Sequence, residues 1–197
     1  MGLASINTAL KNAGMQYDFI GFDACLMATM ENALMLTPYA DYLIASEETE
    51  PGVGWYYTNW LTALSKDTSM PTIEIGQKIV DDFVDVCAQI CRGQKTTLSV
   101  VDLAELQETI PKKLSAFATS TSDLIQNDQY QTVSSARYNT REFAQSSKID
   151  QVDLVHLAQN LNTAEGNQLT LAIKSAVKYN RTSSNMLNAN GISIYFP

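Results

Sequence analysis

This sequence has little basic charge, few cysteines and no long hydrophobic run, and each shortage excludes a class of protein. Lysine and arginine number 13 against 21 acidic residues, for a net charge of -8, and they form no cluster. Nucleic acids and anionic membranes bind basic patches, so we expect neither as a partner. No apolar run is long enough to cross a bilayer, and the opening MGLASINTALKNAG lacks the basic region and apolar core of a signal peptide. The remaining composition, 45% hydrophobic and 17% charged, is that of a folded domain with a substantial core.

The usual ligands of transition metals are also scarce. The three cysteines, Cys25, Cys87 and Cys91, are too few and too irregularly spaced for a disulfide framework in a chain of this length. Cys87 and Cys91 lie four residues apart in VCAQIC, and we interpret them as buried core thiols rather than metal ligands. The only histidine, His156, is far along the chain, and no acidic loop has the spacing of a calcium site. We therefore expect no metal ion and no cofactor.

Strand and helix patterns alternate along the chain, which indicates an α/β fold with a mainly parallel sheet. Strands are expected at 17–22, 40–47 and 96–103 and in the terminal NGISIYFP. Helices are expected at 3–13, 25–36, 58–67, 72–91, 104–126, 150–161 and 167–180, with a polar stretch of weaker periodicity at about 127–150. No repeat or linker divides the chain, so we expect a single domain over residues 1–197.

The segment DFIGFDACLMAT (18–29) places a thiol where the first buried strand ends. Functional groups of open α/β sheets gather at the carboxyl ends of strands. If Cys25 opens the following helix, the helix N-terminus would stabilise its thiolate, and the free N–H groups of the first turn would form an oxyanion hole. The residues alone leave two interpretations open for each side chain. Cys25 is either a nucleophile or, more commonly after a strand, a structural thiol, and Asp23 is either a binding carboxylate or the N-cap of that helix.

Longer elements resemble one family. FDACLMA, the later ASEETEPGVGW and the closing GISIYFP closely resemble the clostripain family of cysteine peptidases, over residues from about 15 to 197. The resemblance implies a caspase-like fold, which is a three-layer αβα sandwich with a mainly parallel sheet. It also implies that Cys25 attacks the scissile carbonyl to form an acyl-enzyme, with its own backbone N–H helping to hold the oxyanion.

The same resemblance implies roles in substrate binding. Asp23 would line the S1 pocket and pair with an arginine or lysine side chain of a peptide substrate, because a carboxylate gives a guanidinium a charge-assisted partner. The loop at 46–55 would form another wall of that pocket, with Ser46, Thr49 and Trp55 as its candidate residues. Its three acids add negative charge near a cationic substrate, and we interpret at least two of them as solvated: Glu47, Glu48 and Glu50.

In this family a histidine upstream of the cysteine, in a His-Gly element, carries the proton to the leaving amine. The residues before Cys25 contain no histidine, and His156 lies among apolar residues and is followed by leucine. We therefore interpret His156 as a partly buried helix residue. We expect the chain to correspond to the C-terminal portion of the family domain, without its N-terminal strands, and to be inactive alone. It would be either a processed heavy chain or a shortened product.

The strand at 17–22 would then lack a neighbour in the sheet, and we expect a light-chain fragment or a second copy of the chain to cover that edge. Two functions follow. The first is a cysteine endopeptidase part that cleaves after arginine or lysine, with its histidine supplied by an upstream segment. The second is a catalytically silent binding or assembly module that keeps the fold. Bacterial members of the family are commonly exported, so we expect a secreted or cell-envelope bacterial protein.

Overall fold

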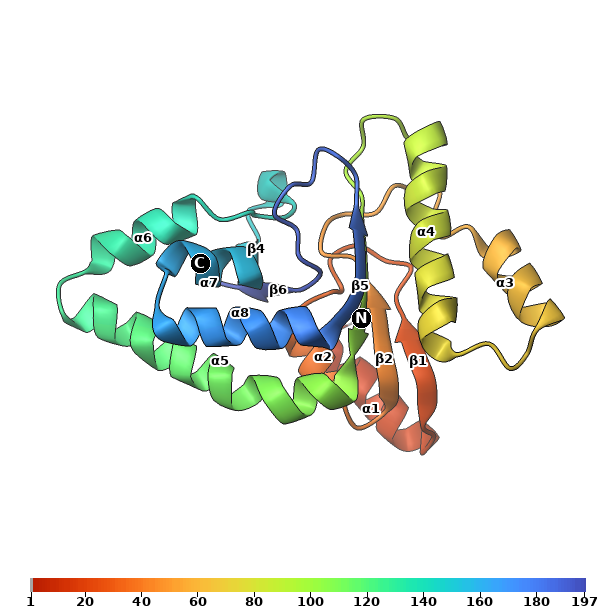
Figure 1. Cartoon of the computed structure of the whole chain (residues 1–197), viewed down its shortest axis with the longest axis horizontal. Helices are drawn as coiled ribbons and strands as arrows, with labels where there is room; N and C mark the ends of the chain where they lie inside the picture. Colours follow the sequence, from red (N-terminus) through yellow and green to blue (C-terminus); the bar gives the residue numbers. More distant parts are fainter. Residues whose placement is uncertain (1) are drawn as a thin grey trace.

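Four strands form the central sheet, in the spatial order β1-β2-β3-β5 (Figure 1). The computed structural model describes residues 2–197. The strands are β1 (Tyr17–Gly21), β2 (Ala40–Ala45), β3 (Thr97–Asp102) and β5 (Val177–Thr182). β1 and β2 pair in parallel, whereas β3 is antiparallel to both β2 and β5. β1, β2 and β5 therefore point one way and β3 the other, so the sheet is mixed: the pairing of β1 with β2 is parallel, as expected, and the two pairings of β3 are antiparallel.

Helices cover both faces of this sheet. One face carries α4 (Thr72–Ile90), with α3 (Tyr57–Lys66) packed against that helix, and the other face carries α2 (Met30–Leu36), α5 (Leu103–Gln126) and α8 (Ala164–Ala176) (Figure 1). Successive strand residues point to opposite faces, so Leu43 packs in the α2–α5–α8 core while its neighbour Ile44 packs against α4. Val101 and Val100 divide in the same way. This is the three-layer αβα arrangement that the sequence predicts.

A second, smaller sheet lies beside the first. β4 (Gln151–Asp153) and β6 (Ser193–Tyr195) pair antiparallel, next to α6 (Tyr130–Tyr138) and α7 (Leu154–Leu161) (Figure 1). A short 3-10 helix, η1 (Gln145–Ser147), precedes β4. The predicted terminal strand is thus present as β6, but it belongs to this second sheet.

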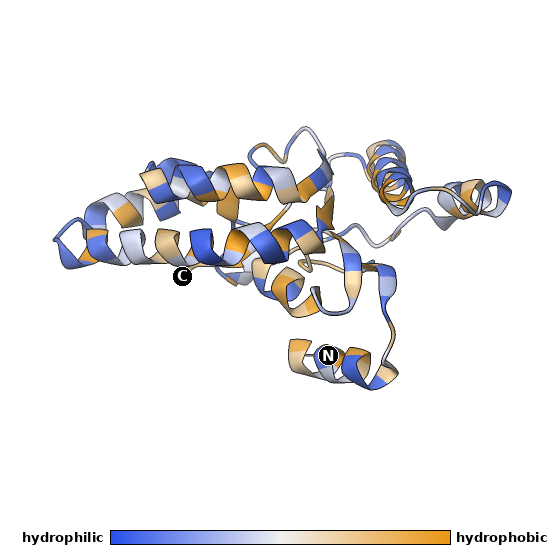
Figure 2. Cartoon of the chain, turned by 60° about the horizontal axis from the view of Figure 1, so that its bottom comes forward, coloured by the Kyte–Doolittle hydropathy of each residue, from blue (hydrophilic) through white to orange (hydrophobic). Residues whose placement is uncertain are grey.

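The remaining helix, α1 (Leu3–Ala13), stands at the periphery, and Figure 2 shows it below the rest of the chain. It is attached by Leu10, which packs against the α2–α5–α8 core, and by Asn7, whose Oδ1 accepts the Tyr39 hydroxyl at 2.7 Å. Among the helices of residues 2–197, none is long and apolar enough to cross a membrane.

Three predicted boundaries differ from the structure. The segment VKYNRT, expected to continue a helix, is the strand β5, which contains valine, tyrosine and threonine, residues that favour strands, and which pairs with β3. The helix expected from residue 150 begins at Leu154, where Asp153 accepts the His156 N–H as N-cap, and β4 precedes it. The polar stretch after residue 127 contains α6.

Candidate active site

Cys25 lies in a turn after β1, not at the start of a helix. α2 begins only after Thr29, whose Oγ1 accepts the N–H of Asn32 at 3.1 Å and so forms the N-cap. Between the two, Leu26 has a φ of 65°, a left-handed conformation that an α-helix does not contain. The prediction that Cys25 opens the helix is therefore wrong, and so is the alternative that Asp23 caps it.

Backbone groups of the loop after β2 hold the Cys25 thiol instead. Its Sγ accepts the N–H of Glu50 at 3.2 Å and lies 4.0 Å from the Glu50 carbonyl oxygen. The backbone of Glu50, rather than a helix N-terminus, therefore contacts the sulfur. Cys25 is exposed, whereas Cys87 and Cys91 are buried, as expected of core thiols. Burial raises the pKa of the Cys87 thiol to about 12, with Cys91 adding to the effect.

The carboxylate of Asp23 faces the same loop. Its Oδ1 accepts the backbone N–H of Trp55 and its Oδ2 accepts the hydroxyl of Tyr57, each at 3.1 Å. Gly54 makes this close approach possible: it has a φ of 64°, and a Cβ there would lie 2.9 Å from Oδ2 of Asp23. Asp23 is otherwise exposed, so its carboxylate is fixed in orientation and open to a ligand.

Aromatic rings support this carboxylate. Trp55 is 6% exposed, and its ring packs over β1 at Gly21, where an added Cβ would lie 2.8 Å from the ring. The ring of Tyr57 lies between two tryptophans, with its centroid 6.4 Å from that of Trp55 and 5.7 Å from that of Trp60. We call Asp23, Glu50, Trp55 and Tyr57 the Asp23 cluster.

The loop does not bring Ser46 and Thr49 to this cluster by any hydrogen bond. Ser46 is completely buried, and its hydroxyl contacts the carbonyl of Glu48 and Oγ1 of Thr97, each at 2.9 Å. Thr49 is exposed, and both its N–H and its hydroxyl donate to Oε1 of Glu48. Of the three predicted wall residues, only Trp55 bonds to Asp23.

Two of the loop acids are fully buried, contrary to the expectation that they are solvated. Glu47 and Glu48 are each 1% exposed. Oε2 of Glu47 accepts the N–H of Gly191 at 2.8 Å, on the connection between β5 and β6. Oε1 of Glu48 accepts the N–H of Ala144 at 3.0 Å, just before η1, and its Oε2 lies 3.6 Å from Nζ of Lys95. These bonds anchor the loop to three distant segments.

The exposed thiol of Cys25 and the exposed carboxylate of Asp23 lie just after β1, and the loop after β2 holds both. This arrangement agrees with the resemblance of their motifs to the clostripain family. The model of the clostripain family matches residues 1–194. This chain belongs to the clostripain family.

Solved structures of related proteases show the same caspase-like fold. A clostripain from Bacteroides thetaiotaomicron, in complex with the peptide inhibitor BTN-VLTK-AOMK, is 18% identical with a TM-score of 0.72, and the match covers 99% of this chain and 85% of that one. A secreted C11 cysteine protease from the same species, with an irreversible peptide inhibitor, is 25% identical with a TM-score of 0.66, over 100% of this chain and 57% of that one. An inactive zymogen C11 protease from Parabacteroides distasonis is 20% identical with a TM-score of 0.70, and the match covers 100% of this chain and 57% of that one. Among curated proteins, none matches this sequence.

The histidine of this clostripain-family chain is engaged away from Cys25. Nδ1 of His156 accepts the N–H of Arg141 at 2.9 Å, which makes the ring a neutral acceptor. Burial lowers its pKa, although the charge of Asp153 acts in the opposite direction. No hydrogen bond joins His156 to Cys25 within the described residues. The ring is therefore the partly buried helix residue that the sequence predicts.

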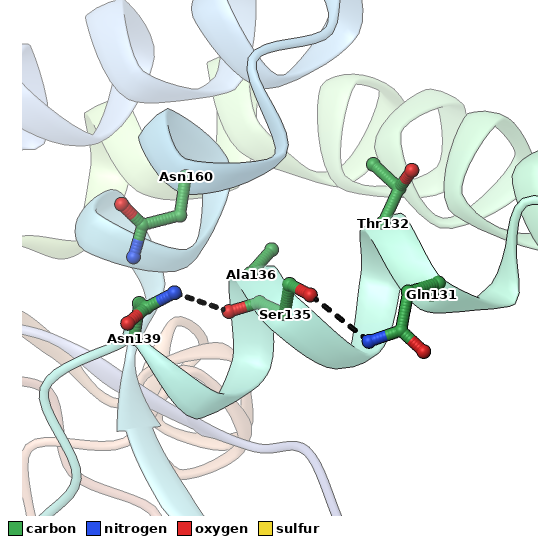
Figure 3. A pocket seen from close by; sticks show the side chains of 6 residues that line it. All are labelled: Gln131, Thr132, Ser135, Ala136, Asn139 and Asn160. Atoms are coloured by element: carbon green, nitrogen blue, oxygen red, sulfur yellow. Dashed lines mark hydrogen bonds between the residues drawn. The ribbon is translucent and has the colours of Figure 1, made fainter.

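A surface hollow of about 410 Å³ between α6 and α7 offers no alternative centre of catalysis (Figure 3). Amides, hydroxyls and one methyl group line it: Gln131, Thr132, Ser135, Ala136, Asn139 and Asn160. Asn139 bonds to the carbonyl of Ser135 and Gln131 to its hydroxyl (Figure 3). The lining of this hollow contains no acid, base or thiol.

Sequence reasoning missed two members of the Asp23 cluster. Tyr57 lies two residues beyond the predicted wall, and nothing in GWYY distinguishes its hydroxyl from that of Tyr56. Glu50 was taken together with the other loop acids, although it differs from Glu47 and Glu48 in lying next to Asp23.

Proposed function

We propose that this chain carries the nucleophile and the S1 pocket of a cysteine endopeptidase that cleaves after arginine or lysine. One observation supports this best. The exposed Cys25 thiol and the exposed Asp23 carboxylate lie two residues apart and are held by one loop, through the N–H of Glu50 and the N–H of Trp55. A peptide whose basic side chain reaches Asp23 would thus bring its carbonyl carbon to the thiol.

In the proposed reaction, the Cys25 thiolate attacks the scissile carbonyl and forms an acyl-enzyme, which water then hydrolyses. The backbone N–H of Cys25 has no hydrogen-bond partner among residues 2–197, so it remains free to donate to the oxyanion. Asp23 pairs with the guanidinium or ammonium group of the substrate. The peptide inhibitor in the relative's complex has the sequence VLTK, which ends in a basic residue and agrees with this assignment.

The proton for the leaving amine requires a histidine, and we propose that another segment supplies it. β1 is the last strand at one side of the sheet, and its outer edge has no partner strand within the described residues. A light-chain fragment, or a second copy of this chain, would pair there and carry the histidine to Cys25. A zymogen form of one relative supports processing into fragments. Because two relatives are described as secreted, we also propose a secreted or cell-envelope bacterial location.

Covalent labelling of Cys25 tests the proposal. Electrophilic peptides that differ only in their last side chain, which is arginine, lysine or the neutral citrulline, are incubated with the chain, and modified peptides are located by mass spectrometry. We expect the basic probes to modify Cys25 at least about tenfold faster than the citrulline probe, because an ion pair at Asp23 contributes on the order of 1.4 kcal/mol or more. The buried Cys87 and Cys91 serve as internal controls.

Two variants separate the parts of this proposal. Cys25→Ala should abolish labelling, and Asp23→Asn should slow the basic probes to the rate of the citrulline probe. If no probe modifies Cys25, even when an upstream fragment with a His-Gly element is added, the peptidase assignment is wrong. If all three probes react equally, the assignment of Asp23 is wrong but Cys25 remains the nucleophile.

A further inference from the structure

The carboxyl group of Glu50 is enclosed and accepts no hydrogen bond of normal geometry, although the indole N–H of Trp55 lies nearby. Both of its oxygens are shielded from solvent, and neither accepts a hydrogen bond from any residue in the described part of the chain. The neighbouring groups are the carboxylate of Asp23 and the indole of Trp55. A buried carboxylate that lacks a donor is strongly disfavoured in its ionised form. Glu50 is therefore held in a setting that favours the neutral acid.

Asp23 makes this preference stronger. Its Oδ1 and Oδ2 already accept from Trp55 and Tyr57, and it has no salt bridge to a lysine or arginine among residues 2–197. Two adjacent carboxyl groups without a cation share a proton, because both cannot be ionised cheaply. Burial, followed by the charge of Asp23, raises the pKa of Glu50 to about 8, although the indole of Trp55 acts in the opposite direction. The neutral acid then donates its O–H to Asp23.

We propose that Glu50 holds a proton against Asp23 while the Asp23 cluster is empty, and releases it to solvent when a basic side chain binds there. The inference rests on the proposed function, in which Asp23 receives the arginine or lysine of a substrate. The O–H bond of the Glu50 carboxyl group breaks, its electron pair stays on the carboxylate, and the proton passes to water or to the buffer base. The cluster thus gains one negative charge for the positive charge that enters.

The other titratable groups around Glu50 do not take over this role near neutral pH. Tyr57 comes from α3, and burial and its hydrogen bond to Asp23 raise its pKa. Cys87 comes from α4 on the other side, and its pKa is raised to about 12, in part by Glu50 itself. Cys25 contacts the backbone of Glu50 rather than its side chain. The groups that face the carboxyl from each element therefore leave Glu50 as the source of the proton.

A measurable consequence follows from linkage. Binding that releases one proton becomes tighter as the pH rises, by up to about tenfold per pH unit, until the proton is lost in the empty state as well. For Glu50 that limit lies at a pH of about 8. A basic ligand should therefore gain affinity between about pH 6 and about pH 8 and no further above it. A neutral ligand of the same shape should show no such gain.

The experiment uses the unmodified chain and two small ligands, N-acetyl-arginine amide and its neutral isostere N-acetyl-citrulline amide. Binding is followed by tryptophan fluorescence, because Trp55 belongs to the cluster, at pH values from about 6 to about 9. Calorimetry in two buffers of different ionisation enthalpy then counts the protons released. We expect the arginine ligand to release close to one proton at about pH 7 and the citrulline ligand to release none.

Glu50→Gln is the decisive variant, because glutamine keeps the shape and can donate to Asp23 but has no proton to lose. Its affinity for the arginine ligand should not change with pH, whereas Glu108→Gln, an exposed site on α5, should behave as the unmodified chain does. An unchanged pH dependence in Glu50→Gln, or no proton release from the unmodified chain, would overturn the inference while the S1 assignment stands. If the arginine ligand binds no better than citrulline at every pH, the S1 assignment fails and the inference fails with it. The proton count needs no variant, so it decides the question even if Glu50→Gln does not fold.

Discussion

Gly54 determines how closely the loop after β2 approaches Asp23. Its left-handed backbone and the 2.9 Å separation between an added Cβ and Oδ2 of Asp23 leave no room for a side chain. Two residues earlier, Gly52 would meet no atom within 4 Å and does not have a positive φ. The two glycines therefore form a matched pair, of which only one touches the candidate binding carboxylate.

Gly54→Ala should displace Asp23 and strain the turn, because alanine resists a φ of 64°. We expect a loss of about 1 kcal/mol in the free energy of unfolding, and about tenfold slower labelling of Cys25 by an arginine electrophile. Gly52→Ala should change neither quantity appreciably. Equal effects from the two substitutions would show that the contact with Asp23 does not matter. Urea unfolding and timed mass spectrometry measure the two quantities.

At the scale of single residues, the sequence predicted the chemical types better than their surroundings. Cys25 and Asp23 are at the end of a strand, as the apolar run before them indicated. The prediction that a helix N-terminus supports the thiol was wrong, because the left-handed Leu26 separates Cys25 from α2. Nothing in CLMAT signals that conformation. Glu50 and Tyr57 reach Asp23 only through the folded loop, so no local pattern could identify them.

Among the structural elements, the loop after β2 is the one most constrained by buried charge. Glu47 and Asp153 lie together in the interior, and both are tied to the β5–β6 connection: Glu47 to the N–H of Gly191, and Asp153 to the side-chain amide of Asn190 at 2.9 Å. Burial, followed by the charge of Asp153, raises the pKa of Glu47 well above its ordinary value. The loop that carries Glu50 and Trp55 is thus fixed at its base by an acid that keeps its proton.

The stability of the chain should therefore fall as the pH rises. The unfolded chain releases the Glu47 proton near its ordinary pKa of 4.5, while the folded chain retains it, so raising the pH above that value favours unfolding. Through Glu47, the free energy of unfolding should fall by up to about 1.4 kcal/mol for each pH unit above that value. Glu47→Gln keeps an acceptor for Gly191 and a donor for Asp153, and it should reduce this loss. Urea unfolding at about pH 5 and about pH 8 measures the difference.

The comparison requires a substitution that removes a charge without removing a buried acid. Glu108→Gln on α5 is suitable, because Glu108 is exposed. It should keep the pH dependence of the unmodified chain. If Glu47→Gln and Glu108→Gln show the same pH dependence, Glu47 is not the group that titrates on unfolding.

Elements with a long periodic pattern were predicted well, and short ones were not. α4 and α5 are present almost as expected, because their apolar spacing extends over several turns. β4 has three residues and was absorbed into a predicted helix, since so short a strand is defined only by its pairing with β6. β5 was missed for a different reason: α8 leads into it without a turn, and its polar residues, Lys178, Asn180 and Arg181, reduce the apolar signal.

For the whole molecule, the free edge of β1 matters most. The Tyr17 N–H donates to the carbonyl of Tyr39 at 2.8 Å, toward β2. Because alternate residues of a strand direct their N–H groups to opposite sides, the N–H of Asp18 points to the outer edge. Another strand that pairs with β1 would use it. The chain spans 57% of the length of two of its structural relatives.

Asp18→Pro tests the use of that edge. Proline removes the outward N–H and leaves the pairing between β1 and β2 intact, so association through the edge should be lost while the chain stays folded. Sedimentation of the chain, alone and with an upstream fragment, measures the association, and circular dichroism checks the fold. The control is Asp18→Asn, which changes the side chain at the same position and keeps the backbone N–H. Asp41→Pro would not serve, because Asp41 lies within β2. Unaltered association in Asp18→Pro would place the partner elsewhere.

The contact between Cys25 and Glu50 has one more consequence. The backbone of Glu50 touches the thiol, and its side chain lies beside the carboxylate that is proposed to receive the substrate. A ligand that displaces Glu50 would therefore act on the backbone that holds the sulfur as well as on the binding carboxylate. The chain should then distinguish a basic from a neutral side chain in the rate constant of acylation as well as in affinity.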